Sequence, residues 1–217
     1  MSCRGRIALL VLLGSGCAID DRVLMLQPDP ILIDDFEDGN GQPSDPRFGQ
    51  WEFTTFNANP QTSDLGLVQP GYGSKWCMRG DWVVTDMPDG KLNYPGFLAV
   101  TRVLGSMDLT PYTHINFAHR YQHVGSCIAL QFVQVEIGCT ELDSSFYAHV
   151  PVSSTWAPAS VALADLAEGL FPPPKGTLRD DCLKVADYIQ LVTESDVADG
   201  QCQSGTLFFD DVSVTAD

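Results

Sequence analysis

The apolar residues of this 217-residue chain come in short runs, which Gly, Pro, Asp and Ser interrupt at fairly regular intervals. Runs of this length are typical of β-strands, and their spacing favours an antiparallel sandwich. The expected strands are Ile31–Phe36, Gln50–Phe56, Lys75–Met78, Trp82–Thr85, Gly96–Thr101, His114–Tyr121, Ile128–Ile137, Phe146–Val152, Ala157–Ala162, Tyr188–Thr193 and Leu207–Val214. Only the segment Leu163–Leu170 is helix-like. We therefore expect an all-β fold, an antiparallel β-sandwich or jelly roll with at most one or two short helices.

Residues 1–16 have the composition of a secretion signal. Arg4 and Arg6 come first, an apolar run over residues 7–13 follows, and small residues lead to Cys17. The apolar run is shorter than the ~20 residues that span a bilayer. The segment resembles a bacterial lipoprotein signal, which implies that Cys17 is the lipid-modified first residue of the mature chain. Ordinary secretion and a plain buried segment are the alternatives.

The rest of the chain divides into a tether and one domain. Residues 17–30 are expected to form the tether, because Pro28 and Pro30 break any regular element there. Residues 31–217 show no internal repeat and no change of composition, so we expect a single β-sandwich domain. The lipoprotein interpretation predicts an extracytoplasmic domain that only a lipid anchor holds to the membrane of the cell envelope.

The charge of the chain excludes one class of partner. Acidic residues number 28 and basic residues 12, for a formal net charge of −16. Such a surface repels nucleic acid phosphates and anionic lipid headgroups, so we expect no nucleic acid partner. Solubility alone explains the charge. Cation binding requires clustered acids, and the stretch "ILIDDFEDGN" from Ile31 to Asn40 contains one such cluster.

Seven cysteines occur, and five of them remain after Cys3 and Cys17 are set aside with the signal and its anchor. In an oxidising compartment these five allow at most two disulfides and leave one thiol. A Cys127–Cys139 bridge is disfavoured, because the segment between them is expected to be one strand, which would separate the two residues by roughly 40 Å. A disulfide needs Cα atoms within about 7 Å.

The sequence contains no catalytic motif such as GxSxG or HExxH and no phosphate-binding glycine loop, so we expect no enzyme. Most large aromatics of a sandwich lie in its core, and Trp51 and Trp156 are expected there. Trp82 and Tyr121, together with His119 and His123, are the candidates for a ligand-facing platform, because sugars pack on aromatic rings beside polar groups. A polar, aromatic-lined strand face without a ligand is the alternative.

Six segments, taken in order, carry a resemblance to a known family. They are "LIDDFEDGN" from Leu32, Gly49 with Trp51, "YGSKWCMRG" from Tyr72, Met107–Arg120, Phe146–Leu166 and Leu207–Val214. The set resembles the jelly-roll carbohydrate-binding modules of the galactose-binding-like superfamily. The resemblance covers nearly all of the mature chain, and it implies a polysaccharide or glycan ligand without placing the ligand site.

The resemblance also implies a structural calcium ion that joins the first and last strand regions. Asp35, Glu37 and Asp210 match the ligand positions, and backbone carbonyls near Ser74 are expected to complete the shell. Calcium prefers hard oxygen ligands, which suits these residues. Strand alternation predicts that Asp210 shares a face with Phe208, Val212 and Val214. The alternatives are that these acids accept backbone N–H groups or pair with Arg79 or Arg102.

Three functions are therefore weighed. The first is a non-catalytic, membrane-anchored, extracytoplasmic carbohydrate-binding module. The second is a surface structural or adhesion protein with the same sandwich and no sugar site, in which Trp82, Tyr121, His119 and His123 would be buried. The third is a glycan hydrolase, which requires a pair of carboxylates facing a cleft.

Overall fold

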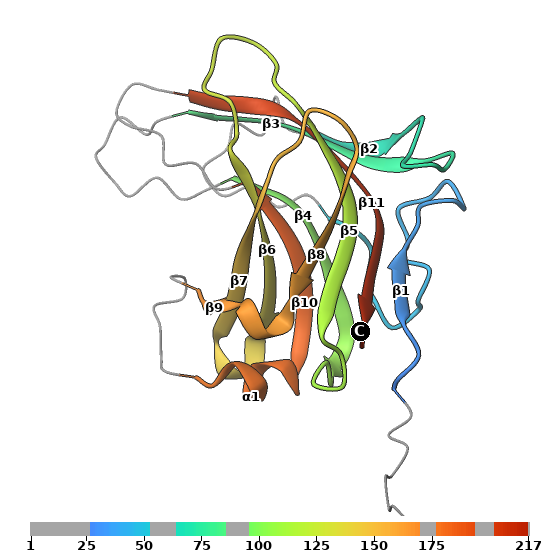
Figure 1. Cartoon of the computed structure of the whole chain (residues 1–217), viewed down its shortest axis with the longest axis vertical. Helices are drawn as coiled ribbons and strands as arrows, with labels where there is room; N and C mark the ends of the chain where they lie inside the picture. The colour runs from blue at the N-terminus through green and yellow to red at the C-terminus, as the bar shows by residue number, and fades with distance from the viewer. Residues whose placement is uncertain (1–26, 53–63, 86–95, 170–176, 194–201, 217) are drawn as a thin grey trace, which may run out of the picture.

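The computed structural model describes residues 27–52, 64–85, 96–169, 177–193 and 202–216, with the backbone alone for residues 64, 82–85 and 96–104. Two antiparallel sheets face each other across a core (Figure 1). The first sheet has the order β2 (Asp64–Val68), β3 (Cys77–Thr85), β11 (Cys202–Thr215), β5 (His114–Gln122) and β8 (Ala157–Ala162), and β1 (Ile31–Asp34) also pairs with β11. The second has the order β4 (Gly96–Met107), β10 (Ala186–Thr193), β6 (Phe132–Cys139), β7 (Ser144–Pro151) and β9 (Ala167–Glu168). The predicted all-β sandwich is confirmed.

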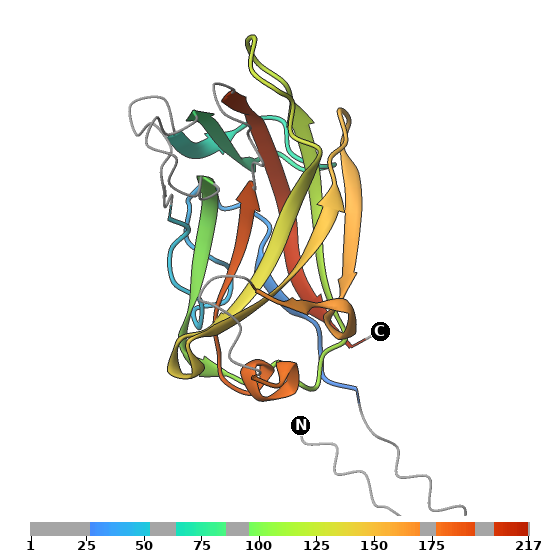
Figure 2. The same ribbon diagram turned by 90° about the vertical axis from the view of Figure 1, so that its left-hand side faces the viewer.

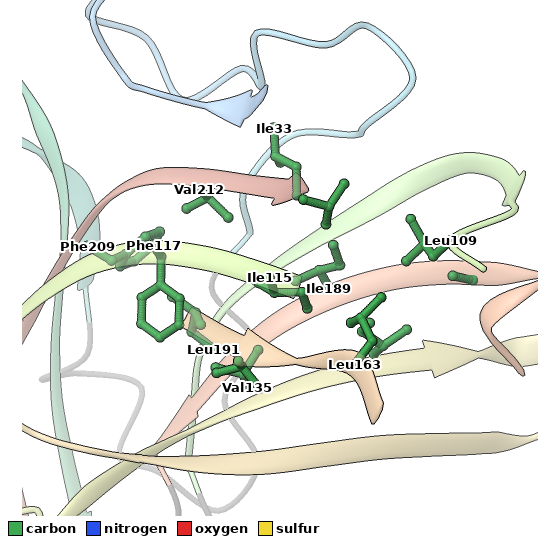
Figure 3. Close-up of a cluster of buried hydrophobic side chains, with 14 of the residues drawn as sticks. Ile33, Leu109, Ile115, Phe117, Val135, Leu163, Ile189, Leu191, Phe209 and Val212 are labelled. Carbon is green, nitrogen blue, oxygen red and sulfur yellow. The ribbon is translucent and has the colours of Figure 1, made fainter. Parts of the chain in front are cut away.

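The core lies between the sheets, where each strand contributes alternate residues. Ile115 and Phe117 of β5 face Val135 of β6 and Leu191 of β10 across this space (Figure 3). The strands of both sheets therefore bury one apolar side against the other layer. The outer side of each sheet is left to other residues, and these are the ones that can meet a ligand.

The two ends of the long strand β11 pair with different strands. Its residues from Cys202 to Phe209 pair with β3, whereas Val212 to Val214 pair with β1. The register of β11 shifts between these two parts, and Asp211 there has a positive φ of 52°. This bulge adds one residue to the alternation, so that Phe209 and Val212 both point into the core.

The bulge corrects the expected face of Asp210. Asp210 is fully buried, as expected, but it shares its side of the sheet with Phe208 and not with Val212 and Val214, which belong to the core. The alternation of side chains along a regular strand does not predict the extra residue of this bulge.

Several other boundaries differ from expectation. The two predicted strands around Met78 and Trp82 are one strand, β3, because Gly80 and Asp81 pair with β11 instead of making a turn. The helix-like segment Leu163–Leu170 forms a 3₁₀ turn, Leu163–Asp165, followed by β9. Leu163 and Leu166, three residues apart, are both buried there. Of the predicted strand Gln50–Phe56, Glu52 forms an isolated bridge and residues 53–56 lie outside the described residues.

The elements that were not predicted include the strands β2 and β9 and the short helix α1 (Arg179–Leu183). The strand β11 begins at Cys202, five residues before the predicted strand Leu207–Val214. No helix of the described residues is long and apolar enough to cross a membrane.

Disulfides join Cys127 to Cys202 and Cys139 to Cys182, and Cys77 is a buried free thiol. The expected pattern of two bridges and one thiol is confirmed, and Cys127 does not pair with Cys139. The predicted strand Ile128–Ile137 is shorter than expected, because β6 begins at Phe132 and Ile128 forms only an isolated bridge with Gln203.

Candidate functional site

The outer side of the five-stranded sheet carries a group of polar and aromatic side chains. Val133, Val135 and Ile137 of β6 belong to the core. Because strand residues alternate, Phe132, Gln134 and Glu136 point to the other side. The sequence "FVQVEI" thus places an aromatic ring, an amide and a carboxyl in a row on the outside of the sheet.

The neighbouring strands extend this row. Glu136 lies opposite Tyr147 of β7 and Gln190 of β10, and Gln134 lies opposite His149. Tyr188, two residues before Gln190, is on the same side. These strands lie side by side in Figure 2. We call the set the polar–aromatic face; it consists of Phe132, Gln134, Glu136, Tyr147, His149, Tyr188 and Gln190.

Hydrogen bonds connect this face across three strands. The amide of Gln134 donates to Glu136 Oε2 at 2.9 Å, and the hydroxyl of Tyr188 donates to Glu136 Oε1 at 3.3 Å. His149 Nε2 lies 3.2 Å from Gln134 Oε1. The rings of Phe132 and His149 stack with centroids 4.1 Å apart, and Tyr147 follows at 5.2 Å from His149. These contacts hold the side chains of the polar–aromatic face in one arrangement.

Exposure divides this face into a floor and a rim. Gln134, Glu136 and Gln190 are only 7%, 7% and 6% exposed, whereas Tyr147 and Tyr188 are half-buried. Burial raises the pKa of Glu136 above its ordinary value, although hydrogen bonds from Ser145, Gln190, Gln134 and Tyr188 oppose the shift. The floor therefore offers amide and carboxyl groups, and the rim offers aromatic rings.

Two of the predicted ligand residues are used inside the fold. Tyr121 is 6% exposed and His119 is 2% exposed. The Tyr121 hydroxyl donates to Ser204 O at 3.0 Å and accepts from Leu130 N at 2.9 Å. His119 Nε2 lies 3.1 Å from Pro151 O. Tyr121 belongs to the core between the sheets, and His119, two residues before it in β5, points to the same side. Both side chains therefore pack inside the sandwich, which does not support their predicted ligand role.

The other two candidates are placed differently. His123 is exposed, and its Nε2 lies 2.7 Å from Cys127 O in the loop after β5. Trp82 lies in β3 opposite Gly205, and its side chain is outside the described residues. The three of these residues with described side chains, Tyr121, His119 and His123, therefore do not form one platform.

Trp51 and Trp156 also differ from each other. Trp51 is buried in the core, as expected, and its Nε1 donates to Asp34 Oδ2 at 2.9 Å. Trp156 is half-buried beside the outer side of the six-stranded sheet, where its ring lies 6.4 Å from that of Phe208. The expectation of a core position for Trp156 is therefore corrected.

The predicted metal ligands gather where β1 leads into the following loop and meets β11. Glu37 Oε1 accepts the backbone N–H groups of Lys75 and Trp76, at 2.8 and 3.0 Å. Asp210 Oδ2 accepts Tyr72 N and the Ser74 hydroxyl, at 2.8 and 2.7 Å. These contacts match the alternative in which the acids accept backbone N–H groups. Asp35 Oδ1 accepts Glu37 N at 3.2 Å.

The acids of this region affect one another's pKa. Hydrogen bonds, foremost from Trp76 N, lower the pKa of Glu37, whereas burial raises the pKa of Asp210. Burial also raises the pKa of Asp211, and Asp210, Asp35 and Glu37 add to this shift by repulsion. A bound cation would relieve this repulsion.

The oxygens around Gly71 test whether a hard cation fits. A Cβ at Gly71 would lie 2.1 Å from Ser74 Oγ, 2.2 Å from Trp76 O and 2.6 Å from Asp210 Oδ2, so hydroxyl, carbonyl and carboxylate oxygens converge there. Among the described residues no three His, Cys, Asp or Glu side chains form a metal set by themselves. A cation here would therefore depend on carbonyl and hydroxyl oxygens, which calcium accepts.

Sequence reasoning missed the polar–aromatic face and also Asp34. Asp34, not Asp35, is the fully buried acid of the first strand, and burial raises its pKa to about 7. The missed face had a signal in the alternation of "FVQVEI", "FYAHV" and "DYIQLV", each of which puts an aromatic residue two places before a polar one. Only the register of the sheet shows that the three pairs are neighbours.

The sequence matches no family model and no curated protein. Solved structures do resemble it. One is a family 11 carbohydrate-binding module from Clostridium thermocellum in complex with a β-1,3-1,4-mixed-linked tetrasaccharide, with a TM-score of 0.58 and 17% identity over 86% of this chain and 95% of that one. Another is the family 11 module of the cellulosomal cellulase Lic26A-Cel5E of the same organism, with a TM-score of 0.56 and 14% identity over 87% and 95% of the two chains. At these identities the likeness establishes the jelly-roll fold of carbohydrate-binding modules, which confirms the expected resemblance at the level of the fold.

Proposed function

We propose that this domain is a non-catalytic carbohydrate-binding module that binds a neutral glucan chain along the polar–aromatic face. The observation that carries the proposal is the hydrogen-bonded row of amides, carboxyl and aromatic rings on the outside of the five-stranded sheet. Sugar rings present flat C–H surfaces that pack on aromatic side chains, and their hydroxyls need fixed polar partners. Tyr147 and Tyr188 supply the first, and Gln134, Glu136 and Gln190 supply the second.

Affinity electrophoresis in gels that contain mixed-linkage β-1,3-1,4-glucan tests this proposal, because one similar module is solved with that sugar. Tyr188→Ala is expected to weaken binding about tenfold through the loss of one ring contact. Tyr112→Ala is the matched control, since Tyr112 is also half-buried but lies just before β5 of the other sheet. Absence of retardation by any neutral glucan, with folded wild-type protein, would reject the proposal. An unchanged affinity of Tyr188→Ala would reject the site.

The contacts of Glu136 support a binding role over a hydrolytic one. A glycosidase places two carboxyl groups on either side of the scissile bond. The groups that hydrogen-bond Glu136 are two amides and two hydroxyls. Reducing-end assays on the glucan that binds are expected to detect no release of sugar. Release that Glu136→Gln abolishes would establish a hydrolase instead.

A surface structural or adhesion role remains the second candidate, because one observation favours it. That role predicted the burial of Trp82, Tyr121, His119 and His123. The structure buries Tyr121 and His119, whereas His123 is exposed and the side chain of Trp82 lies outside the described residues. The two functions differ in sugar binding alone, so the electrophoresis experiment separates them.

The location of the domain belongs to the same proposal. Two disulfides fit an oxidising, extracellular compartment. We propose that a lipid on Cys17 anchors the chain to the membrane of the cell envelope. Cys17→Ser is expected to move the protein from the detergent-soluble membrane fraction to the medium or the soluble fraction. Equal membrane association of the variant would contradict the anchor.

We further propose that a structural calcium ion joins the start and the end of the sandwich. Glu37 and Asp210 would hold it, with Asp35, Ser74 Oγ and Trp76 O as nearby oxygens. When bound, the ion supplies positive charge among carboxylates that repel one another.

A further inference from the structure

The outer side of the six-stranded sheet contains an arginine that no acidic side chain neutralises. The described basic side chains are Arg47, Lys75, Arg79, Arg120, Arg179 and Lys184. Asp45, Asp81, Asp180 and Asp181 pair with four of them, and Lys75 lies over the ring of Trp76. Arg120 makes no ion pair among the described residues, and its Nε is buried without a hydrogen-bond partner. An arginine without an acidic partner is unusual in a chain with 28 acidic residues.

Aromatic rings hold this arginine in place. The guanidinium carbon of Arg120 lies 4.1 Å from the ring centroid of Phe208 and 5.5 Å from that of Trp156. The two rings are 6.4 Å apart and meet edge to face, so the guanidinium sits in the corner between them. Such contacts cover part of the cation without neutralising its charge, and they leave its N–H groups in the guanidinium plane for an acceptor.

A further ring extends the surface. The centroid of Tyr72 lies 5.9 Å from that of Trp156, and both side chains are half-buried. The backbone N–H of Tyr72 donates to Asp210, which fixes the loop that carries the ring. Asp210 also accepts from Ser74 and Asp211. The nearby carboxylate is thus engaged by other donors and does not pair with Arg120.

We propose that Arg120, Trp156 and Tyr72 form a second sugar site, which takes a uronic acid residue. The rings offer a stacking surface for the sugar, and the guanidinium offers a planar fork that matches a carboxylate. The site lies on the opposite sheet from the polar–aromatic face, so the two can act independently. It goes beyond neutral glucan binding, since it selects for charge.

Isothermal titration with trigalacturonate and its trimethyl ester isolates the charge, because the two probes differ only at the carboxyl groups. A short oligomer is chosen because the net charge of −16 repels long polyanions. Wild-type protein is expected to bind the acid at least tenfold tighter than the ester, and to lose this preference as salt is raised from 50 to 500 mM. Equal affinity for acid and ester, or no binding of the acid, would overturn the proposal.

Variants then assign the site. Arg120→Gln is expected to remove the preference for the acid, and Arg120→Lys to keep part of it because the charge stays while the fork is lost. Arg79→Gln is the control. Arg79 of β3 lies opposite Phe208 of β11, but its guanidinium is already paired with Asp81. Thermal unfolding of each variant shows that it is folded. If Arg120→Gln and Arg120→Lys both bind the acid like wild type, the guanidinium has only a packing role.

Two further arms separate the alternatives. Tyr188→Ala is expected to weaken the binding of neutral glucan about tenfold and to leave the binding of trigalacturonate unchanged, so that failure of one site does not hide the other. A sulfated trisaccharide of the same length is expected to bind more weakly than trigalacturonate. Tighter binding of the sulfated sugar would overturn the assignment to uronic acids.

Discussion

Asp34 and Asp210 are fully buried acids, and each accepts several hydrogen bonds. Asp34 accepts Phe36 N at 2.8 Å and Trp51 Nε1 at 2.9 Å, and Asp210 accepts backbone and hydroxyl donors. Both lie where the chain leaves regular pairing, at the end of β1 and at the bulge of β11. Acids are poor strand formers, but at these points they satisfy N–H groups that the ladder leaves unpaired.

His119 gives a prediction about pH. Burial lowers the pKa of His119 below its ordinary value, so the folded state resists protonation more than the unfolded state does. Stability is therefore present above the unfolded pKa, and it is lost as pH falls below it, by at most about 1.4 kcal/mol per pH unit. The stability advantage of wild type over His119→Gln, measured by urea unfolding, is expected to shrink between pH 7 and pH 5. A constant advantage would contradict this.

Asp211 gives a prediction about backbone strain. Its φ of 52° is unfavourable for a residue with a side chain, and three carboxylates repel it. Asp211→Gly in the presence of a chelator is expected to raise the free energy of unfolding by about 1 kcal/mol. Asp211→Val is expected to lower it, because a β-branched residue tolerates this conformation worst. A stabilising effect of valine would show that the bulge does not need a left-handed residue.

At the scale of elements, the sequence predicts strands such as β8 better than short or glycine-containing elements such as α1 and β2. β8 was predicted with its observed bounds, Ala157–Ala162, because polar turns flank a short run. The helix α1 has five residues and gives no periodic signal. The strand β2 contains Gly66, which weakens its pattern. Short elements of this kind owe their form to packing and not to their own sequence.

The candidate site was harder to predict than the fold, for a related reason. Alternation within β6 can be found in the sequence, and it predicts that Gln134 and Glu136 share a side. The register that sets Glu136 opposite both Tyr147 and Gln190 depends on two strands that are distant in the sequence. Ligand-facing residues were predicted at His119 and Tyr121 instead, because the spacing of these two residues cannot show which side of β5 faces the core.

The disulfide between β6 and α1 gives a prediction about elements. It joins Cys139 to Cys182 across 43 residues. Replacing both with Ala is expected to cost about 4 kcal/mol in the free energy of unfolding, because the unfolded chain gains freedom. Cys77→Ala is the control, since Cys77 is buried but makes no bridge. If the double variant loses no more than Cys77→Ala, the bridge contributes little.

At the scale of the whole molecule, the sandwich brings the two ends of the domain together. β1 pairs with the last part of β11, beside the end of the chain (Figure 1). The segment after β1 then reaches the loop before β3 through Glu37, and that loop reaches β11 through Ser74 and Asp210. Three distant parts of the sequence therefore meet at one group of acids.

This convergence leads to the prediction for calcium. An ion that binds only the folded state raises the midpoint of thermal unfolding, and the stabilisation grows with the logarithm of the ratio of its concentration to the dissociation constant. Wild-type protein in millimolar calcium is expected to unfold at a clearly higher temperature than in a chelator. Glu37→Gln and Asp210→Asn are each expected to abolish this difference, whereas Glu141→Gln, an exposed acid elsewhere, keeps it. The variants also separate the ion from the hydrogen bonds, because an amide oxygen can still accept Trp76 N or Tyr72 N but carries no charge. An unchanged midpoint of the wild type, with no metal by elemental analysis, would mean that hydrogen bonds alone close the sandwich.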